Sequence, residues 1–191
     1  ELLRRMSFES FDVRGNRASY QQRQSLEEAK RAAQNFAETP EGWLVFLGTT
    51  GCGKTHLSVA VANERLKLGQ EVLYFQVADL LDHLRVTFNP DSPVTYDRLF
   101  ESVRTVPLLI LEDFGTHHAT PWAREKLHQI IVHRYDARLP TIVTTAEVEP
   151  GEEERKDPLW SRLLDATVVS LVPIDAPDYR HQGRSSPSKS R

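Results

Sequence analysis

The chain contains the octapeptide Gly48-Thr49-Thr50-Gly51-Cys52-Gly53-Lys54-Thr55, which matches the pattern G-x-x-x-x-G-K-[ST]. Glycines at three of these positions let successive backbone N–H groups turn toward phosphate oxygens, which a Cβ atom would obstruct. Lys54 supplies a positive charge for the β- and γ-phosphates, and the Thr55 hydroxyl can bind Mg²⁺. The octapeptide therefore predicts a site for a nucleoside triphosphate with Mg²⁺, and all eight residues are candidates for binding it.

Patterns typical of strands and helices surround this phosphate loop. Residues 43–47 before it form a continuous apolar run, and a helical pattern follows it over residues 54–68 and ends at Gly69. A second helical pattern begins after Thr120, with Pro121 in its first turn. Further apolar runs of strand length occupy residues 72–75, 108–111, 141–145 and 168–172. Continuous apolarity is typical of strands covered on both faces, so the sequence predicts an α/β fold with a mostly parallel sheet.

Composition limits the class of protein. The chain has 191 residues, and its 24 Lys and Arg residues against 27 Asp and Glu residues give a formal net charge of −3. This balance excludes binding of nucleic acid through bulk positive charge, so any such contact must come from a local patch. No apolar run is long enough to span a membrane, and the single cysteine, Cys52, cannot form an internal disulfide. We expect a cytoplasmic protein, and because no initiator Met is present we expect a fragment of a longer chain.

Two consecutive acids, Glu112 and Asp113, follow the apolar run at residues 108–111. A phosphate-loop protein needs a carboxylate on a nearby strand to hold Mg²⁺ opposite the loop Thr, and a second acid can activate the attacking water. In one register Glu112 takes the metal role together with Thr55, and Asp113 activates water. In the other register Asp113 holds the metal and no base follows, because Phe114 comes next. The usual order places Asp first, so both registers stay open.

With these two motifs in hand, the chain resembles the AAA+ ATPases of the DnaC/DnaI helicase-loader group, with the IstB transposition-helper proteins as close relatives. The resemblance covers roughly residues 8–180. Beyond the two motifs it rests on Ser7-Phe8-Glu9-Ser10-Phe11-Asp12, Arg134-Tyr135, Leu139-Pro140-Thr141-Ile142-Val143-Thr144-Thr145, Ser161-Arg162-Leu163 and Asp178-Tyr179-Arg180. The phosphate loop alone does not select a family, whereas this ordered set is fairly specific.

The resemblance implies a three-layer α/β/α P-loop fold whose parallel sheet has the strand order 5-1-4-3-2. It implies an N-terminal segment and helix over residues 1–38, an AAA+ core over residues 39–182 and a disordered tail over residues 183–191. The residues between the last strand and this tail are too few for the helical lid that many AAA+ proteins carry. We therefore expect a minimal lid or none.

The resemblance also assigns roles around ATP and Mg²⁺. It implies a homo-oligomer that forms on ATP binding, in which Arg162 is an arginine finger that reaches the γ-phosphate of a neighbouring subunit. Arg180 is a candidate second sensor of the nucleotide. Phe11 and Asp12 are candidates for the adenine pocket, although a packing role fits them equally well. For Arg162 and Arg180 the competing interpretation is an arginine on the solvated surface.

The end of the fourth strand departs from the family pattern. The family places Asn there to sense the γ-phosphate, whereas this chain has Thr144-Thr145-Ala146. Thr145 can replace the Asn only weakly, through its hydroxyl. Together with Glu112 in the place of Asp, this departure predicts a weak ATPase in which ATP acts chiefly as a conformational switch.

The segment between the second and third strands, residues 79–104, is the predicted contact with DNA. In the family it touches single-stranded DNA, and Arg85 and Arg98 are the candidates here. The resemblance thus implies an ATP-dependent accessory protein of DNA replication that loads a replicative helicase, which it would contact through a region N-terminal to this chain. Two alternatives stay open: an IstB-like transposition helper that binds duplex DNA, and a small P-loop phosphotransferase.

Overall fold

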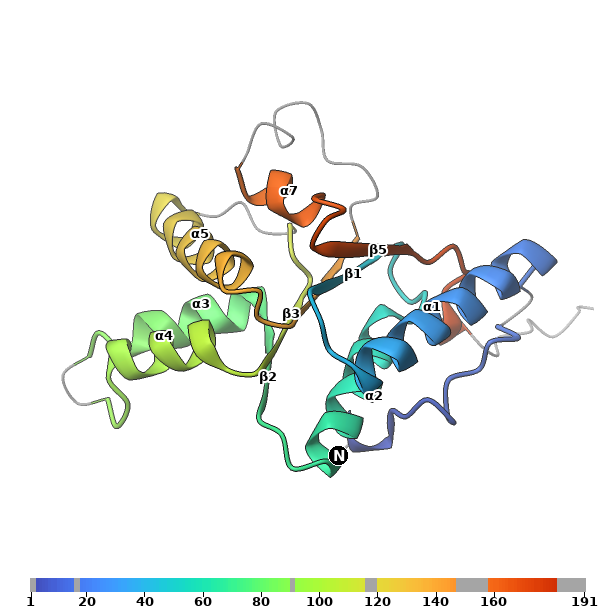
Figure 1. The fold of residues 1–191 in the computed structure, drawn as a ribbon, viewed down its shortest axis with the longest axis horizontal. Helices are drawn as coiled ribbons and strands as arrows, with labels where there is room; N and C mark the ends of the chain where they lie inside the picture. The colour runs from blue at the N-terminus through green and yellow to red at the C-terminus, as the bar shows by residue number, and fades with distance from the viewer. Residues whose placement is uncertain (1–2, 16–17, 90–91, 116–119, 147–157, 182–191) are drawn as a thin grey trace, which may run out of the picture.

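The computed structural model describes residues 3–15, 18–89, 92–115, 120–146 and 158–181. These residues form a five-stranded parallel sheet between two layers of helices (Figure 1). In chain order the elements are η1 (Leu3–Arg5), α1 (Tyr20–Glu38), β1 (Trp43–Leu47), α2 (Lys54–Lys67), β2 (Val72–Gln76), α3 (Val77–Val86), α4 (Tyr96–Thr105), β3 (Leu108–Glu112), α5 (Pro121–Asp136), β4 (Thr141–Thr145), α7 (Pro158–Leu163), β5 (Val169–Pro173) and η2 (Tyr179–His181). The strands lie in the order β2-β3-β4-β1-β5, which confirms the predicted order 5-1-4-3-2 read from the other edge. The predicted tail at residues 183–191 lies outside the described residues.

The three central strands β1, β3 and β4 are buried along their whole length, as their continuous apolar runs predict. For the other two runs, the expectation of cover on both faces is wrong. β2 is only partly buried, and Leu171 of β5 is 39% exposed. Both strands lie at the edges of the sheet, where the second neighbouring strand is absent and the helical layers end.

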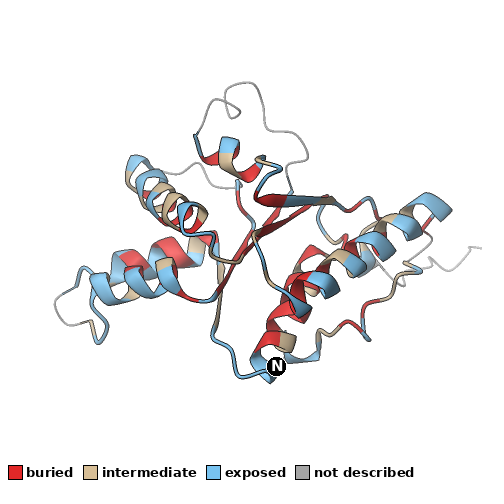
Figure 2. Ribbon diagram, in the orientation of Figure 1, coloured by how far each residue is buried: buried red, intermediate tan, exposed pale blue. Residues whose placement is uncertain are grey.

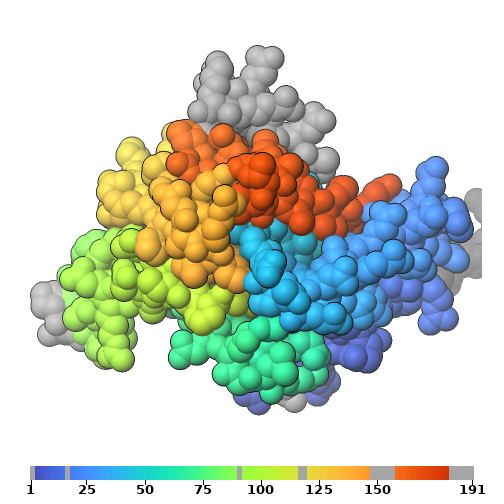
Figure 3. All heavy atoms as spheres, viewed as in Figure 1, coloured from blue at the N-terminus to red at the C-terminus, as the bar shows by residue number. Residues whose placement is uncertain are grey.

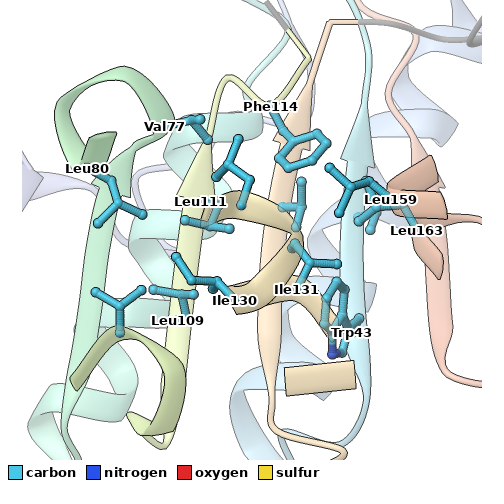
Figure 4. Packing of buried hydrophobic residues seen from close by; sticks show 14 of the residues in the cluster. Trp43, Val77, Leu80, Leu109, Leu111, Phe114, Ile130, Ile131, Leu159 and Leu163 are labelled. Atoms are coloured by element: carbon cyan, nitrogen blue, oxygen red, sulfur yellow. The ribbon is translucent and has the colours of Figure 1, made fainter. Parts of the chain in front are cut away.

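Alternate residues of each strand contribute to two apolar cores, one on each face of the sheet. On one face Trp43 and Val45 pack with residues of α3, α4, α5 and α7 (Figure 4). On the other face Leu44 and Phe46 pack with α1 and α2. Most helices bury the side that faces the sheet and expose the opposite side, whereas α2 is buried nearly all round because α1 packs against it (Figure 2). The α-helices before β2 thus form one layer, and the described α-helices after β2 form the other.

The helix ends follow the capping signals in the sequence. α2 stops at Gly69, which has φ 76°. The Gly69 N–H donates to the Leu66 carbonyl (3.0 Å) and the Gln70 N–H donates to the Arg65 carbonyl (3.1 Å), which is the Schellman arrangement. At the start of α5 the Thr120 hydroxyl accepts a hydrogen bond from the Ala123 N–H (3.3 Å). Both predicted helices are confirmed.

The two ends of the described chain flank this core. α1 begins at a capping box in which Ser19 and Gln22 exchange hydrogen bonds, and it packs on α2 and on β5. The domain boundary at residues 38 and 39 stays a prediction. After β5, the described residues contain one short 3-10 helix, η2, and no larger helical lid. In the described part of the chain, no helix combines the length and the apolarity needed to cross a membrane.

A buried arginine joins the outer helices to the sheet. The Arg134 side chain is fully buried, and its guanidinium donates to the carbonyls of Val106 (2.9 Å) and Pro140 (2.6 Å) and to the Thr141 hydroxyl (2.9 Å). Burial lowers the pKa of Arg134 to about 10, so the group stays charged at neutral pH. These bonds hold α5 against the first residues of β3 and β4. They give Arg134 a structural role.

Candidate nucleotide-binding site

The phosphate loop leaves the carboxyl end of β1 and turns directly into α2. Gly51 (φ 80°) and Gly53 (φ 111°) adopt the left-handed conformation that residues with a Cβ avoid. The Gly48 N–H donates to the Thr145 carbonyl (3.2 Å), so the start of the loop is attached to the end of β4. The loop therefore lies at the carboxyl edge of the sheet, which is where ligands bind in open α/β folds.

Lys54, the first residue of α2, folds back over the loop. Its side chain is 7% exposed, and Nζ donates to the carbonyls of Gly48 (2.6 Å) and Thr49 (2.9 Å). The ammonium group is thus held inside the curve of the loop by groups that carry only partial charges. Beside it, burial raises the pKa of the Cys52 thiol, which therefore stays protonated at neutral pH and serves as an apolar packing group.

Glu112 at the end of β3 lies against the first turn of α2. It is 2% exposed, and Thr55 Oγ1 donates to its Oε2 (2.7 Å) while the Ser58 hydroxyl donates to its Oε1. Thr55 and Ser58 are three residues apart on the helix, so both hydroxyls reach the same carboxylate. Burial raises the pKa of Glu112, and the two hydroxyl hydrogen bonds act in the opposite direction.

Asp113 follows directly but has different surroundings. It is exposed, and its φ of 56° is uncommon for a residue other than glycine. The Asp113 N–H donates to Thr144 Oγ1 (3.1 Å), and the Phe114 N–H donates to the Thr144 carbonyl (2.8 Å). These bonds tie the end of β3 to β4 and turn the chain sharply after Glu112. One acid is therefore buried against Thr55, and the other faces solvent.

The oxygen atoms of Thr55 and Glu112 are suited to Mg²⁺. A hydroxyl and a carboxylate are hard donors, and Mg²⁺ in nucleotide sites is commonly held by one or two protein groups together with phosphates and water. No cluster of three or more His, Cys, Asp or Glu side chains occurs among the described residues, so they offer no all-protein cage for a metal. Thr55 thus contacts the acid that the first register assigns to the metal, and the choice between the two registers stays a prediction.

The N-terminal segment, residues 3–15, covers the loop from one side. The Phe11 side chain is 7% exposed, and a Cβ atom on Gly53 would lie 2.8 Å from its ring. Asp12 instead accepts hydrogen bonds from the backbone N–H of Arg14 (3.0 Å) and from its Nε (3.3 Å). Phe11 thus packs on the phosphate loop, whereas Asp12 shapes a local turn beside it.

The segment after β5 returns to the same loop. The Tyr179 N–H donates to the Gly51 carbonyl (3.1 Å), and the Asp178 carboxylate lies so close that any side chain at Gly51 would overlap it. Asp178 also accepts a hydrogen bond from the Arg180 N–H (2.8 Å). The structure therefore brings Arg180 to the edge of the phosphate loop, with its side chain exposed.

Comparison with known families gives this geometry a context. A family model described as "IstB-like ATP binding protein" matches residues 2–186. The chain belongs to this family. The replicative helicase loader DnaC of Buchnera aphidicola subsp. Schizaphis graminum (strain Sg) is 30% identical over 141 residues, which cover 74% of this chain and 55% of that protein. The chain spans about half the length of the curated relatives it matches.

Solved structures show the same fold as this IstB-like chain. The crystal structure of the DnaC helicase loader superimposes with a TM-score of 0.73 at 22% identity, covering 92% of this chain and 99% of that one. The replication initiator DnaA bound to AMPPCP and single-stranded DNA superimposes with a TM-score of 0.69 at 22% identity, covering 92% of this chain and 51% of that one. The likeness identifies the fold as that of AAA+ domains.

Three predicted site residues of this IstB-like protein, Arg162, Arg85 and Arg98, lie outside the phosphate-loop region just described. Arg162 Nη1 donates to the Pro158 carbonyl (3.0 Å), and its guanidinium lies 5.8 Å from the centre of the Tyr135 ring. Arg85 lies 5.1 Å from the centre of the Trp122 ring. Arg98 is exposed on α4.

The aromatic residues around Arg85 form what we call the hairpin cluster: Phe88, Tyr96, Phe100 and Trp122, with the cations Arg85 and Lys126. Phe88 stacks on Tyr96 (4.9 Å between ring centres), and Tyr96 stacks on Phe100 (5.3 Å). Arg98 is two residues from Tyr96, roughly 200° around the axis of α4, so it lies on the opposite side of that helix. The structure thus places Arg85 in an aromatic setting and separates Arg98 from it.

Sequence reasoning assigned no site role to Ser58, His56 or Asp178, although Asp178 belongs to a stretch that carries the family resemblance. Ser58 has a usable signal, because a hydroxyl three residues after the loop Thr lies on the same helix face. His56 and Asp178 make contacts that depend on how segments distant in sequence fold over the loop, and no spacing in the chain reveals those contacts.

Proposed function

We propose that this chain is the ATP-binding part of a DNA replication accessory protein that helps to place a ring-shaped helicase on single-stranded DNA. One observation carries the proposal: Thr55 and Glu112 meet beside a complete phosphate loop in a chain of the IstB-like ATP binding family. The names of the matched relatives, replicative helicase loaders, support the role in replication.

In this proposal the phosphate loop binds Mg·ATP. Its backbone N–H groups surround the phosphates, and Lys54 exchanges the carbonyls of Gly48 and Thr49 for phosphate oxygens, a stronger partner for an ammonium ion. Thr55 and Glu112 hold the metal, which neutralises phosphate charge when it is bound. We propose that Phe11, Asp12 and Arg180 line the nucleotide, and the position of their segments at the loop supports this.

Asp113 is the proposed water-activating group, with Thr145 as a weak substitute for the family's Asn. Asp113 lies in the exposed turn after Glu112, while Thr145 is fully buried. Glu112 stands where the family has Asp, and Thr145-Ala146 stands where the family has Asn, so the usual groups that position water are replaced. We therefore propose slow hydrolysis, so that bound ATP serves mainly to hold one conformation.

We propose further that Arg162 acts on the nucleotide of a neighbouring subunit. Within its own chain the guanidinium rests on the Tyr135 ring, and the Tyr135 hydroxyl donates to Asp165. A guanidinium held by a ring face keeps donors free for phosphate oxygens. This arrangement supports a homo-oligomer that assembles around ATP.

The hairpin cluster is the proposed surface for single-stranded DNA. Stacked rings can accept bases of any sequence while nearby cations meet phosphates. Phe88 is 57% exposed at the tip of this stack, and the Arg85 side chain is 49% exposed. The α3 and α4 helices and the adjoining α5 form one continuous surface at the left of the molecule in Figure 3. The DnaA structure with single-stranded DNA supports this choice of ligand, since this fold makes up about half of that chain.

A second candidate function follows from the family itself. The family match supports ATP binding alone, so the IstB-like transposition helper that binds duplex DNA, which the resemblance implied, stays the second candidate. The same ATP site would serve helicase loading and transposition. A preference for single-stranded or for duplex DNA therefore distinguishes the two functions.

Sedimentation velocity tests assembly and DNA choice together. With a non-hydrolysable ATP analogue and Mg²⁺, we expect the protein to form oligomers and to bind a thymidine oligonucleotide more tightly than a duplex of equal length. Arg162→Ala should prevent assembly while retaining nucleotide binding, whereas Arg124→Ala, which removes an exposed arginine of α5, should assemble normally. A preference for the duplex would favour the transposition role, and failure to bind nucleotide would refute both.

A further inference from the structure

The N-terminal segment is attached to α2 at two points. His56 Nε2 lies 2.9 Å from the Ser7 carbonyl and 3.1 Å from Ser10 Oγ. Two turns further along the same face of α2, Asn63 Nδ2 donates to the carbonyls of Leu3 (3.0 Å) and Met6 (2.8 Å). Because the Ser7 carbonyl can only accept, Nε2 of His56 carries the proton in this contact.

The turn that His56 holds is itself well defined. The Ser7 N–H donates to Ser10 Oγ (2.9 Å) and the Ser10 N–H donates to Ser7 Oγ (3.2 Å), so the two serines close the turn from both ends. A turn closed in this way is rigid, so its position restricts the position of the next residue, Phe11. By holding this turn, His56 thus fixes the position of the Phe11 backbone.

Phe11 in turn contacts both His56 and the phosphate loop. Its ring meets the His56 ring edge-on, with 5.3 Å between the ring centres and 75° between the planes. The same ring covers Gly53, the residue just before Lys54. Gly53 has no side chain to cap α2, and its φ of 111° is one conformation among the many that a glycine can adopt. Phe11 therefore restricts the residue that orients Lys54 and the loop amides.

We propose that His56 is a positioning residue for the nucleotide: it holds the turn at residues 7–10 so that Phe11 keeps Gly53 in the conformation that the phosphate loop needs. The inference rests on the proposed function, because it concerns the same ATP site. His56 does not touch the phosphates in this scheme and acts through Phe11. By linkage, bound nucleotide must strengthen the attachment of the N-terminal segment by the same factor by which the attachment strengthens nucleotide binding.

Three variants separate the hydrogen bond from simple packing. His56→Phe keeps a ring beside Phe11 but removes the donor, and His56→Gln keeps a donor near the position of Nε2. We expect His56→Phe to weaken Mg·ATP binding by about fivefold, the size of one lost hydrogen bond, and His56→Gln to restore most of that loss. Asn63→Ala is the matched control, since it loosens the same segment upstream of the turn, and it should change the affinity by less than about twofold.

A double-mutant cycle tests the route through Phe11. If His56 acts through this ring, Phe11→Leu combined with His56→Phe should bind Mg·ATP no more weakly than the worse single variant. Strictly additive losses would overturn the proposed route. Thermal unfolding of each variant shows whether it is folded, and if His56→Phe is unfolded, His56→Leu, which also lacks the donor, takes its place in the cycle.

Hydrogen exchange gives a readout that does not need ATP. In the unliganded protein, His56→Phe should speed exchange at the backbone amides of residues 7–11 and 51–55, while Asn63→Ala should speed it only around residues 3–6. Normal exchange at residues 51–55 in His56→Phe would overturn the inference even if ATP binds. Failure of the unaltered protein to bind Mg·ATP would refute the proposed function, and the exchange result would still decide the role of His56.

Discussion

At the phosphate loop, Lys54 and Glu112 are buried and their charged atoms have hydrogen-bond partners from the loop and from α2. In the hairpin cluster, Phe88 is 57% exposed and Arg85 is half-exposed; the rings stack, and Arg85 lies over the Trp122 ring while it pairs with exposed Asp82 across the surface (3.4 Å). The first region is arranged before any ligand arrives, which is what discrimination of a small charged molecule requires. The second offers a surface that tolerates many geometries, which suits a long and flexible polymer.

The comparison teaches that the two regions differ in how a substitution acts. A change at the loop leaves a buried charge or carbonyl without its partner, so its cost is large and local. A change in the hairpin cluster removes part of a shared surface, so its cost is smaller and spread over several contacts. The two regions should therefore respond independently to single substitutions.

The largest expected effect comes from Lys54→Ala. Loss of the ammonium should weaken Mg·ATP binding by about 100-fold, since a charge-assisted contact to phosphate is lost in a buried setting. Binding of a thymidine oligonucleotide without nucleotide should stay unchanged, because the hairpin cluster is intact. Calorimetry for ATP and fluorescence anisotropy for DNA measure the two effects.

The control for this experiment is Lys67→Ala. Lys67 lies at the end of the same helix, is exposed and pairs with Glu64 across the surface. It should bind Mg·ATP like the unaltered protein. Equal ATP affinity in Lys54→Ala and Lys67→Ala would contradict the whole assignment of the loop.

A moderate effect is expected from Phe88→Ala, the converse experiment. Removing the exposed ring from the end of the stack should weaken binding of single-stranded DNA by about fivefold, in line with the energy of one base stacked on an aromatic side chain. The dependence on salt should not change, because no charge is removed. Binding of Mg·ATP should also be unaffected.

Tyr20→Ala serves as the matched control, since Tyr20 is 75% exposed at the start of α1 in the other helical layer. If both variants lose DNA affinity equally, the loss reflects nonspecific binding to exposed aromatic rings, and the hairpin cluster is not the DNA-binding surface. If Phe88→Ala alone also loses ATP affinity, the two regions are coupled and the contrast between them fails.

The sequence predicts these two regions unequally well, and the reason is physical. The phosphate loop is a local device: eight consecutive residues carry its glycines, its charge and its hydroxyl, so the pattern indicates the site directly. The sheet order and the helix ends follow from continuous apolar runs and from capping residues such as Thr120 and Gly69. The exposure of the edge strands is harder to predict, because β2 and β5 carry apolar runs that resemble those of buried strands.

What the sequence did not show depends on tertiary contacts. Arg85 and Arg98 look alike in the chain, yet the packing of α3 against α5 places only Arg85 on an aromatic ring. The contacts of His56 and Asp178 arise where both ends of the chain fold back over one loop. The burial of Glu112 by Ser58 likewise needs the angle between α2 and β3, which no local pattern encodes.

The smallest expected effect is on stability, from Glu112→Gln without nucleotide. Burial raises the pKa of Glu112 above its ordinary value of 4.5, so the folded state holds the proton more tightly than the unfolded chain does. Between that value and the raised pKa of the folded state, the folded protein binds more protons, and the free energy of unfolding therefore falls as pH rises. Glutamine cannot ionise, so this loss is absent in the variant.

Urea unfolding at pH 5 and pH 8 measures the difference. Relative to the unaltered protein, Glu112→Gln should gain stability as the pH increases, by less than about 1 kcal/mol because the carboxylate's hydrogen bonds from Thr55 and Ser58 offset part of the cost of its charge. Glu28→Gln, at an exposed position on α1, should show no such trend. A gain at pH 5 that disappears at pH 8 has the wrong sign, and it would mean that the hydroxyls outweigh burial at Glu112. The carboxylate would then be a stable anion before any cation arrives, and the phosphate-loop region would differ from the hairpin cluster in charge as well as in burial.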